Sequence, residues 1–187
     1  GALISMGALQ MGLKEEELPE IIDSWREANP KIVQYWWDVE KAATQAFKTG
    51  KRQEIAKLAF EFYSGTLWMQ LPSGRNLAYL KPRLQPNRFG RMSLTYEGVG
   101  QNHKWARQET YSGRLVENAT QAIARDILAE AMDRISAEGL NIVAHVHDEV
   151  IIEAPKDKYT VDEVCKLMSV NPAWCKGLPL AAAGYKG

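Results

Sequence analysis

The residues best suited to chemistry lie in the segment HVHDEVIIEAP, residues 145–155. Two adjacent carboxylates, Asp148 and Glu149, stand there between two runs rich in β-branched residues. These runs predict the two strands of a β-hairpin, with His147, Asp148 and Glu149 presented together at its tip. The tip is therefore the candidate catalytic site.

Adjacent carboxylates in an apolar surrounding favour a bound metal ion. An unpaired buried carboxylate costs on the order of several kcal/mol unless a cation or hydrogen bonds compensate it. We expect Asp148 and Glu149 to bind Mg2+, which takes oxygen ligands and is commonly held by one or two carboxylates. Two such ions about 3.5–4 Å apart can support phosphoryl transfer. Taken alone, however, a His-Asp-Glu tripeptide more often marks an ordinary turn.

A zinc hydrolase is the alternative chemistry, because His145 and His147 have the spacing of zinc ligands at a strand end. The one other histidine of the sequence is His103, and neither Cys165 nor Cys175 has a second ligand at close spacing. A zinc site would have to recruit distant carboxylates, so the number of available ligands favours magnesium.

Two amphipathic helices and a hairpin are predicted before residue 81. Apolar residues recur at helical spacing in 18–28 and in 32–46. Asn29 is the expected N-cap of the second helix, with Pro30 at its first position and Gly50 as its C-cap. The alternating runs TLWMQL and RNLAYL flank PSG and predict a β-hairpin. From there to residue 113 the pattern predicts irregular structure.

The chain is basic between residues 75 and 114, where eight Lys or Arg accompany two Glu. The cations are Arg75, Lys81, Arg83, Arg88, Arg91, Lys104, Arg107 and Arg114. Interleaved with them are the aromatic residues Tyr79, Phe89, Tyr96, Trp105 and Tyr111. This mixture suits the backbone and bases of a nucleic acid, with a solvated loop as the alternative interpretation.

The longest predicted helix spans 115–137, and a shorter one is predicted near 161–168. The expected apolar stripe of the long helix is Val116, Ala119, Ile123, Ile127, Ala131 and Ile135. A row of donors occupies another face at i, i+4, i+7 and i+11, namely Arg114, Asn118, Gln121 and Arg125. Such a row can reach phosphates, sugars or minor-groove acceptors, although most polar helix faces are simply solvated.

The composition bounds the possible partners and locations. The 23 basic and 23 acidic residues cancel, so only regional charge can attract nucleic acid. No apolar run approaches the roughly 20 residues needed to span a bilayer, so we expect no membrane partner. Two distant cysteines and no secretory leader predict a cytoplasmic setting. Because the chain begins without Met inside an apolar helical pattern, we expect a part of a longer polypeptide.

Several segments, in order, are similar to one enzyme family. VHDEVIIEAP resembles a His-Asp-Glu turn between two palm strands, and YSGRLVENATQAIARDIL a palm helix that contacts primer–template DNA. GALISMGALQMGL, WREANPKIVQYW and LPSGRNLAYL resemble successive segments of a fingers subdomain. The family is that of the family A DNA polymerases, the DNA polymerase I group, and the phage-encoded branch is the most similar. The resemblance runs the length of the chain.

The resemblance implies an α+β fold with two parts. Residues 1–113 would be the later part of a helical fingers subdomain. Residues 114–187 would be the later part of the palm, with an antiparallel β-hairpin packed against helices.

The resemblance also implies roles for single residues. Asp148 would be one of two metal-binding aspartates, Glu149 an auxiliary carboxylate and His147 a neighbour of the primer terminus. Arg114 and Asn118 would contact the duplex near that terminus. We expect minor-groove binding by Gln121, which follows Asn118 by three residues where DNA polymerase I has an interval of four.

The segments that carry the other catalytic Asp and the nucleotide-binding fingers helix do not occur in these residues. We therefore expect the C-terminal part of a template-directed DNA polymerase, inactive alone. Its partners would be primer–template DNA, deoxynucleoside triphosphates, Mg2+ at a two-ion site, and the upstream part of the same polymerase. The alternatives are a non-catalytic DNA-binding module and the zinc hydrolase.

Overall fold

The computed structural model describes residues 2–87, 89–100, 102–155 and 158–187. The helices are α1 (Ala2–Ser5), α2 (Leu18–Ala28), α3 (Pro30–Thr49), α4 (Ser112–Ala137) and α5 (Val161–Met168), with 3-10 turns η1 (Glu15–Glu17) and η2 (Ala173–Cys175). The strands are β1 (Gln53–Ile55), β2 (Leu58–Tyr63), β3 (Thr66–Gln70), β4 (Asn76–Pro86), β5 (Met92–Val99), β6 (Trp105–Glu109), β7 (Asn141–Val146) and β8 (Glu149–Glu153). The predicted α+β class is confirmed.

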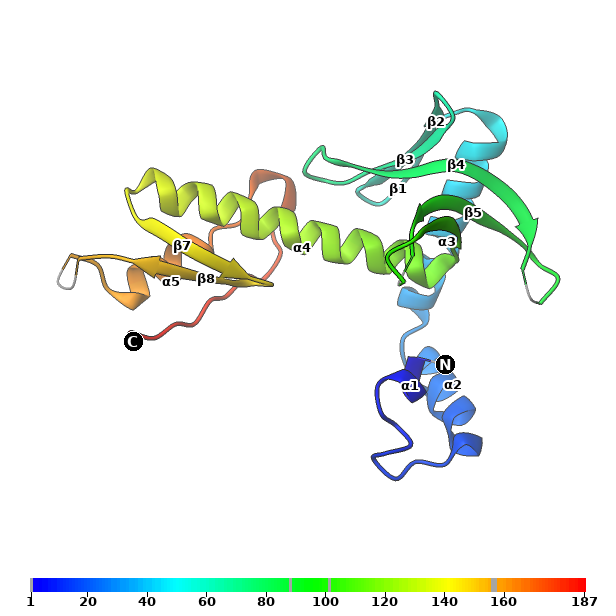
Figure 1. The fold of residues 1–187 in the computed structure, drawn as a ribbon, viewed down its shortest axis with the longest axis horizontal. Helices are drawn as coiled ribbons and strands as arrows, with labels where there is room; N and C mark the ends of the chain where they lie inside the picture. Colours follow the sequence, from blue (N-terminus) through cyan, green and yellow to red (C-terminus); the bar gives the residue numbers. More distant parts are fainter. Residues whose placement is uncertain (1, 88, 101, 156–157) are drawn as a thin grey trace.

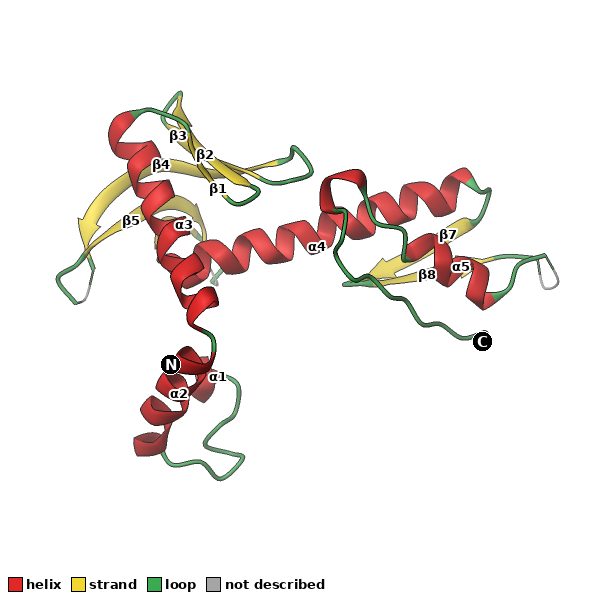
Figure 2. Ribbon diagram, turned by 180° about the vertical axis from the view of Figure 1, so that it is seen from behind, coloured by secondary structure: helices red, strands yellow, loops and turns green. Residues whose placement is uncertain are grey.

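One long helix joins two packed units. Figure 1 shows α4 running from a sheet body, which consists of α3 and β1 to β6, to a hairpin unit of β7, β8 and α5. The helices α1 and α2 form a separate arm below the sheet body in this view. Seen from behind in Figure 2, the strands of the sheet body and the two strands of the hairpin unit lie at opposite ends of α4.

The bend between α2 and α3 is built by Asn29 and Pro30. Pro30 is the first residue of α3, as predicted, and Asn29 occupies the N-cap position. The Asn29 side chain, however, does not accept a hydrogen bond from α3. Its Nδ2 instead donates to the carbonyl of Trp25 in α2 at 2.8 Å. Across the bend, Trp25 and Trp36 stack with their ring centroids 5.6 Å apart.

Strands β1 to β6 form one antiparallel sheet in chain order. The predicted β3–β4 hairpin is confirmed, and Gly74 adopts the positive φ of 88° that its turn requires. The prediction of irregular structure up to residue 113 is wrong, because β4 continues to Pro86 and β5 and β6 follow. Residues 1–113 were also expected to be mainly helical, but six of the eight strands of the described residues lie there. In β5, the apolar inward residues Leu94 and Tyr96 alternate with the polar outward residues Ser93, Thr95 and Glu97, which gives the strand a weak apolar pattern.

The core of the sheet body lies between α3, α4 and one face of the sheet. Its buried residues are Val39, Ala43, Ala46, Leu58, Phe60, Leu67, Met69, Leu71, Tyr79, Leu94, Leu115 and Ala119. Cross-strand pairs such as Phe60 with Met69 place the large side chains on the same face of neighbouring strands. This inner face is the one that packs against the helices.

Helix α4 buries opposite sides in its two halves. At about 100° per residue, Leu115, Ala119 and Asp126 share the side that faces the sheet body. Leu128, Ala131 and Ile135 are buried on a side roughly 180° away, toward the hairpin unit. The predicted stripe is therefore only partly right: Ala119, Ala131 and Ile135 are buried, and its other members, Val116, Ile123 and Ile127, are half-buried.

Side-chain contacts fix α4 to each unit. Asp126 accepts hydrogen bonds from Ser73 Oγ at 2.5 Å and from Arg75 Nε at 2.6 Å, and Arg75 also donates to the carbonyl of Ala122. The β3–β4 turn is thereby clamped to the middle of α4. Near the other end, Arg134 donates to the carbonyl of Leu167 within α5 and to the carbonyl of Val170 just after it.

No helix among the described residues carries an apolar stretch long enough to cross a bilayer.

We predict that Asp126→Ala lowers the free energy of unfolding by about 1–3 kcal/mol, because two hydrogen bonds to a charged, nearly buried acceptor are lost. Urea unfolding provides the measurement. Asp23→Ala is the matched control, since Asp23 pairs with Arg26 on an exposed helix face and should change stability by less than about 1 kcal/mol. Equal effects of the two substitutions would contradict the clamp.

Candidate active site and nucleic-acid interface

The strands β7 and β8 form the predicted hairpin. Val146 pairs with Glu149, so His147 and Asp148 make the connection between the strands. His147 has a φ of +53°, in the left-handed region that is uncommon for residues other than glycine. The predicted position of His147, Asp148 and Glu149 together at the hairpin tip is confirmed.

The surroundings of the tip differ from the expectation. His145, His147, Asp148 and Glu149 are all exposed, and so are the apolar residues Val143, Val146 and Ile151 of the same hairpin. The carboxylates are therefore hydrated, and the predicted desolvation cost does not arise in this structure. The remaining argument for a metal ion at this tip is that Asp148 and Glu149 supply carboxylate oxygens as ligands.

The ligand set at the tip is incomplete for any metal held by protein side chains alone. Among the described residues, no three His, Cys, Asp or Glu side chains are grouped where they could hold a metal ion together. A catalytic zinc site needs three protein ligands, so the zinc alternative for His145 and His147 lacks its third ligand within these residues. Magnesium can be held by one or two carboxylates with water and substrate oxygens, so Asp148 and Glu149 still fit it.

The row of donors on α4 lies on one side of the helix, roughly 90° from both buried faces. Gln121 and Arg125 are exposed. Arg114 and Asn118 are half-buried: Arg114 donates to the carbonyl of Glu109 at 3.1 Å, and Asn118 Nδ2 donates to the hydroxyl of Tyr79 at 3.2 Å. The row thus runs from contacts with the sheet body into open solvent.

The basic stretch is distributed over several surfaces. Arg75 is bound to α4, Arg91 lies over the ring of Trp37 in α3, and Arg114 lies over the ring of Tyr111. Lys81 and Arg107 form ion pairs with Glu97 at 2.8 and 3.2 Å. Arg88 lies outside the described residues. Sequence reasoning treated these cations as one loop, whereas the structure separates them by strand and face.

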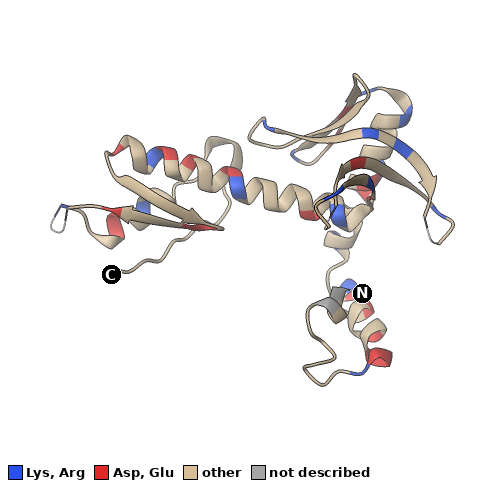
Figure 3. Ribbon diagram, in the orientation of Figure 1, with Lys and Arg blue, Asp and Glu red and all other residues tan. Residues whose placement is uncertain are grey.

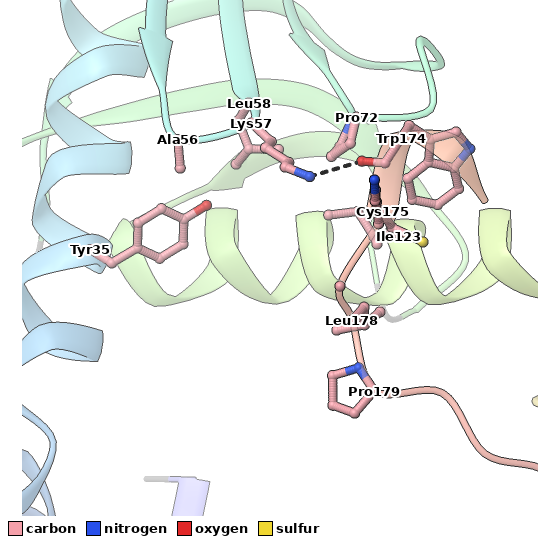
Figure 4. Close-up of a pocket in the computed structure, with 12 residues that line it drawn as sticks. Tyr35, Ala56, Lys57, Leu58, Pro72, Ile123, Trp174, Cys175, Leu178 and Pro179 are labelled. Atoms are coloured by element: carbon pink, nitrogen blue, oxygen red, sulfur yellow. Dashed lines mark hydrogen bonds between the residues drawn. The ribbon is translucent and has the colours of Figure 1, made fainter. Parts of the chain in front are cut away.

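A pocket of about 390 Å³ lies between α3, β2, α4 and the C-terminal segment, as Figure 4 shows. Tyr35, Leu58, Ile123 and Cys175 are among the residues that line it, and Lys57 Nζ donates to the carbonyl of Trp174 at 3.0 Å. Burial raises the pKa of the Tyr35 hydroxyl and of the Cys175 thiol, so neither is activated as a nucleophile at pH 7. The pocket contains none of the predicted site residues.

A comparison with known proteins identifies a relative of the whole chain. A DNA polymerase of Bacillus phage SP02 is 51% identical over 187 residues, which cover 99% of this chain. The chain is homologous to part of a phage DNA polymerase. It spans 29% of the length of that relative. No family model and no solved structure matches the sequence.

We predict that His147→Gly leaves the unfolding free energy unchanged or raises it by up to about 1 kcal/mol, because glycine adopts a positive φ without strain. His147→Val should lower it by more than about 1 kcal/mol. Amide hydrogen exchange in β7 and β8 reports the change locally. Equal acceleration of exchange by both substitutions would show that the His147 side chain, rather than its backbone, holds the tip.

A second prediction concerns alkaline pH. Burial raises the pKa of Tyr79 from 10.0 to about 12. The folded chain therefore retains a proton that the unfolded chain loses above pH 10, so the stability due to Tyr79 falls as pH rises from about 10 to 12. Tyr79→Phe should lose the hydrogen bond from Asn118, and the advantage of the natural protein over this variant should shrink by on the order of 2 kcal/mol between pH 9 and 12. Urea midpoints at both pH values test this, and a constant advantage would refute it.

Proposed function

We propose that this chain is the late fingers and palm part of a family A DNA polymerase of phage type, with the division near Gly113. The observation that carries the proposal is the combination of 51% identity to a phage DNA polymerase over the whole chain with the His147–Glu149 tip. The polymerase would add deoxynucleotides to a primer 3′ end. The primer hydroxyl would attack the α-phosphate of the incoming nucleotide, and pyrophosphate would leave.

The hairpin would place its carboxylates at the reacting phosphates. Asp148 would hold Mg2+, with Glu149 as an auxiliary carboxylate; a bound metal supplies charge stabilisation for the attacking and leaving oxygens. The pairing of the two strands up to Val146 and Glu149 fixes the backbone positions from which both carboxylates project. His147 would lie beside the primer terminus.

The donors of α4 would orient the duplex. Gln121 would donate to minor-groove acceptors, which every base pair presents, and Arg114 would contact a phosphate. Asn118 uses one amide hydrogen for Tyr79 and retains another hydrogen and its oxygen for DNA. These contacts would fix the register of the primer end without reading sequence.

We propose further that the isolated chain does not extend a primer. The tip offers one aspartate, whereas the two-ion mechanism of this family uses two, so the second would come from another part of the polymerase. The exposed Val143, Val146 and Ile151 support this, because a two-stranded hairpin with an open apolar side is marginal unless another segment covers it.

The test is single-nucleotide primer extension with Mg2+, using a polymerase in which the remaining part of the protein is present. Asp148→Ala should lower the extension rate by about three orders of magnitude and leave affinity for primer–template DNA within about threefold. Asp133→Ala is the matched control, since Asp133 is exposed on α4 away from the tip. A normal rate with Asp148→Ala would disprove the catalytic assignment.

A non-catalytic DNA-binding module is the second candidate, and the exposure of the tip without a complete ligand set favours it. In such a module Asp148→Ala would change neither DNA affinity nor any reaction. The extension assay separates the two, because only a polymerase gives product with the unsubstituted protein.

A further inference from the structure

The outer face of the sheet, opposite the inner face that packs on the helices, carries aromatic and basic side chains. Tyr63, Thr66, Leu80, Glu97 and Arg107 are cross-strand neighbours from β2 to β6, so they form one row on this face. Residues two positions along a strand share its face. Trp68 and Trp105 therefore lie on the outer face as well.

Two of these aromatic side chains, Tyr63 and Trp105, are exposed, and Trp68 is half-buried. Tyr63 and Trp68 stack with centroids 5.6 Å apart and an interplanar angle of 22°. Tyr63 is 49% exposed and Trp105 is 58% exposed. The indole Nε1 of Trp105 donates to Glu97 Oε2 at 3.5 Å, which ties this ring to the middle of the row. Flat ring faces are thus held at two places on one surface.

A distorted strand brings a lysine to the same surface. The pairing of β4 with β5 shifts between Leu80 and Arg83, and Lys81 within the shift has a φ of +44°. Arg107 Nη1 donates to the Lys81 carbonyl at 3.1 Å, and the Lys81 amide donates to the Gly65 carbonyl at 3.1 Å. These contacts hold the strained residue beside the turn that follows Tyr63.

Charges of both signs lie on this face. The registers place Glu54, Glu61, Glu97 and Glu109 there, whereas two of the nearby cations, Arg75 and Arg91, contact α4 and α3 instead. Lys81 and Arg107 share the single carboxylate of Glu97, and Arg83 is exposed two residues after Lys81. Figure 3 shows blue segments along β4, the strand that contains Lys81 and Arg83, and red segments on the separate α2 arm. In the β4–β6 part of the face, the three cations Lys81, Arg83 and Arg107 therefore exceed the two carboxylates Glu97 and Glu109 by one.

We propose that this outer face binds single-stranded DNA, with Tyr63, Trp68 and Trp105 stacking on unpaired bases and Lys81 and Arg83 contacting phosphates. Aromatic platforms within a basic surface are the means by which proteins bind single strands without reading sequence. Duplex DNA keeps its base faces stacked internally and offers only groove edges, so it cannot use these rings. Arg107 is a positioning residue, because it supports Lys81 and is mostly buried in its contacts.

This surface is separate from the hairpin tip and from the donor row of α4. It does not depend on the catalytic assignment of Asp148. In a polymerase it would hold template that has not yet been copied, which is a single strand.

The test is fluorescence anisotropy with the 187-residue chain, a labelled 20-nucleotide oligothymidine and a hairpin duplex of similar length. Trp105→Ala should weaken binding of the single strand about tenfold and change duplex binding by less than about twofold. Lys81→Ala should weaken single-strand binding about fivefold and reduce the slope of log affinity against log salt by about 0.7. Trp37→Ala and Lys31→Ala are the matched controls, since both residues are exposed on α3.

The proposal is overturned by a loss of single-strand affinity in Trp37→Ala equal to that in Trp105→Ala. An equal loss of duplex and single-strand affinity in Trp105→Ala would also overturn it. Circular dichroism of each variant verifies that the sheet is intact. Lys81→Ala is a second test of the surface that leaves all aromatic side chains in place. Single-strand binding by Asp148→Ala is measured as a separate test. Unchanged single-strand binding in that variant supports a separate surface, whereas a tenfold loss assigns the binding to the hairpin tip and contradicts the proposal.

Discussion

The arrangement of this chain depends on α4, a single helix that is buried on opposite sides in its two halves. The first half packs Leu115 and Ala119 against the sheet body, and the second half packs Ala131 and Ile135 against the hairpin unit. Because a helix is stiff over its 26 residues, which span about 39 Å, the two units cannot shift independently without losing one of these faces. The ion pair of Arg75 with Asp126 marks the point at which the buried side changes.

The two buried sides of α4 leave a third side of the helix unpacked, and that side carries the polar row. With one side given to each unit, the row from Arg114 to Arg125 is left on an intermediate side, and its first members are drawn into contacts with Glu109 and Tyr79. A polar row on a helix is usually a solvated surface. Here its position between two packed units keeps it in line with the axis that joins the sheet body to the hairpin tip. On the proposed function, that alignment would let one helix orient primer–template DNA toward Asp148.

Local patterns predicted the local elements, and the failures have physical reasons. The β3–β4 and β7–β8 hairpins combine alternation with turn residues, so both were predictable. Strands β5 and β6 were missed because their outward residues include Glu97 and Arg107, which pair with each other across strands and look like loop residues in the sequence. A single apolar stripe was predicted for α4, since the sequence does not show that a helix changes its buried side. The exposure of Asp148 was likewise invisible, because apolar neighbours in sequence need not be buried.

Charge separation follows from the same architecture. The chain has no net charge, yet its charge is uneven along the sequence: residues 14–28 contain six carboxylates and two cations, whereas residues 50–109 contain four carboxylates and ten cations. Interactions between exposed charges fade beyond about 8–10 Å at moderate salt, so these regions act on a ligand separately. A polyanion would therefore meet an attractive sheet and a repulsive arm. On the proposed function, this uneven distribution would keep nucleic acid away from the arm, and the neutral total charge hides the difference between the two regions.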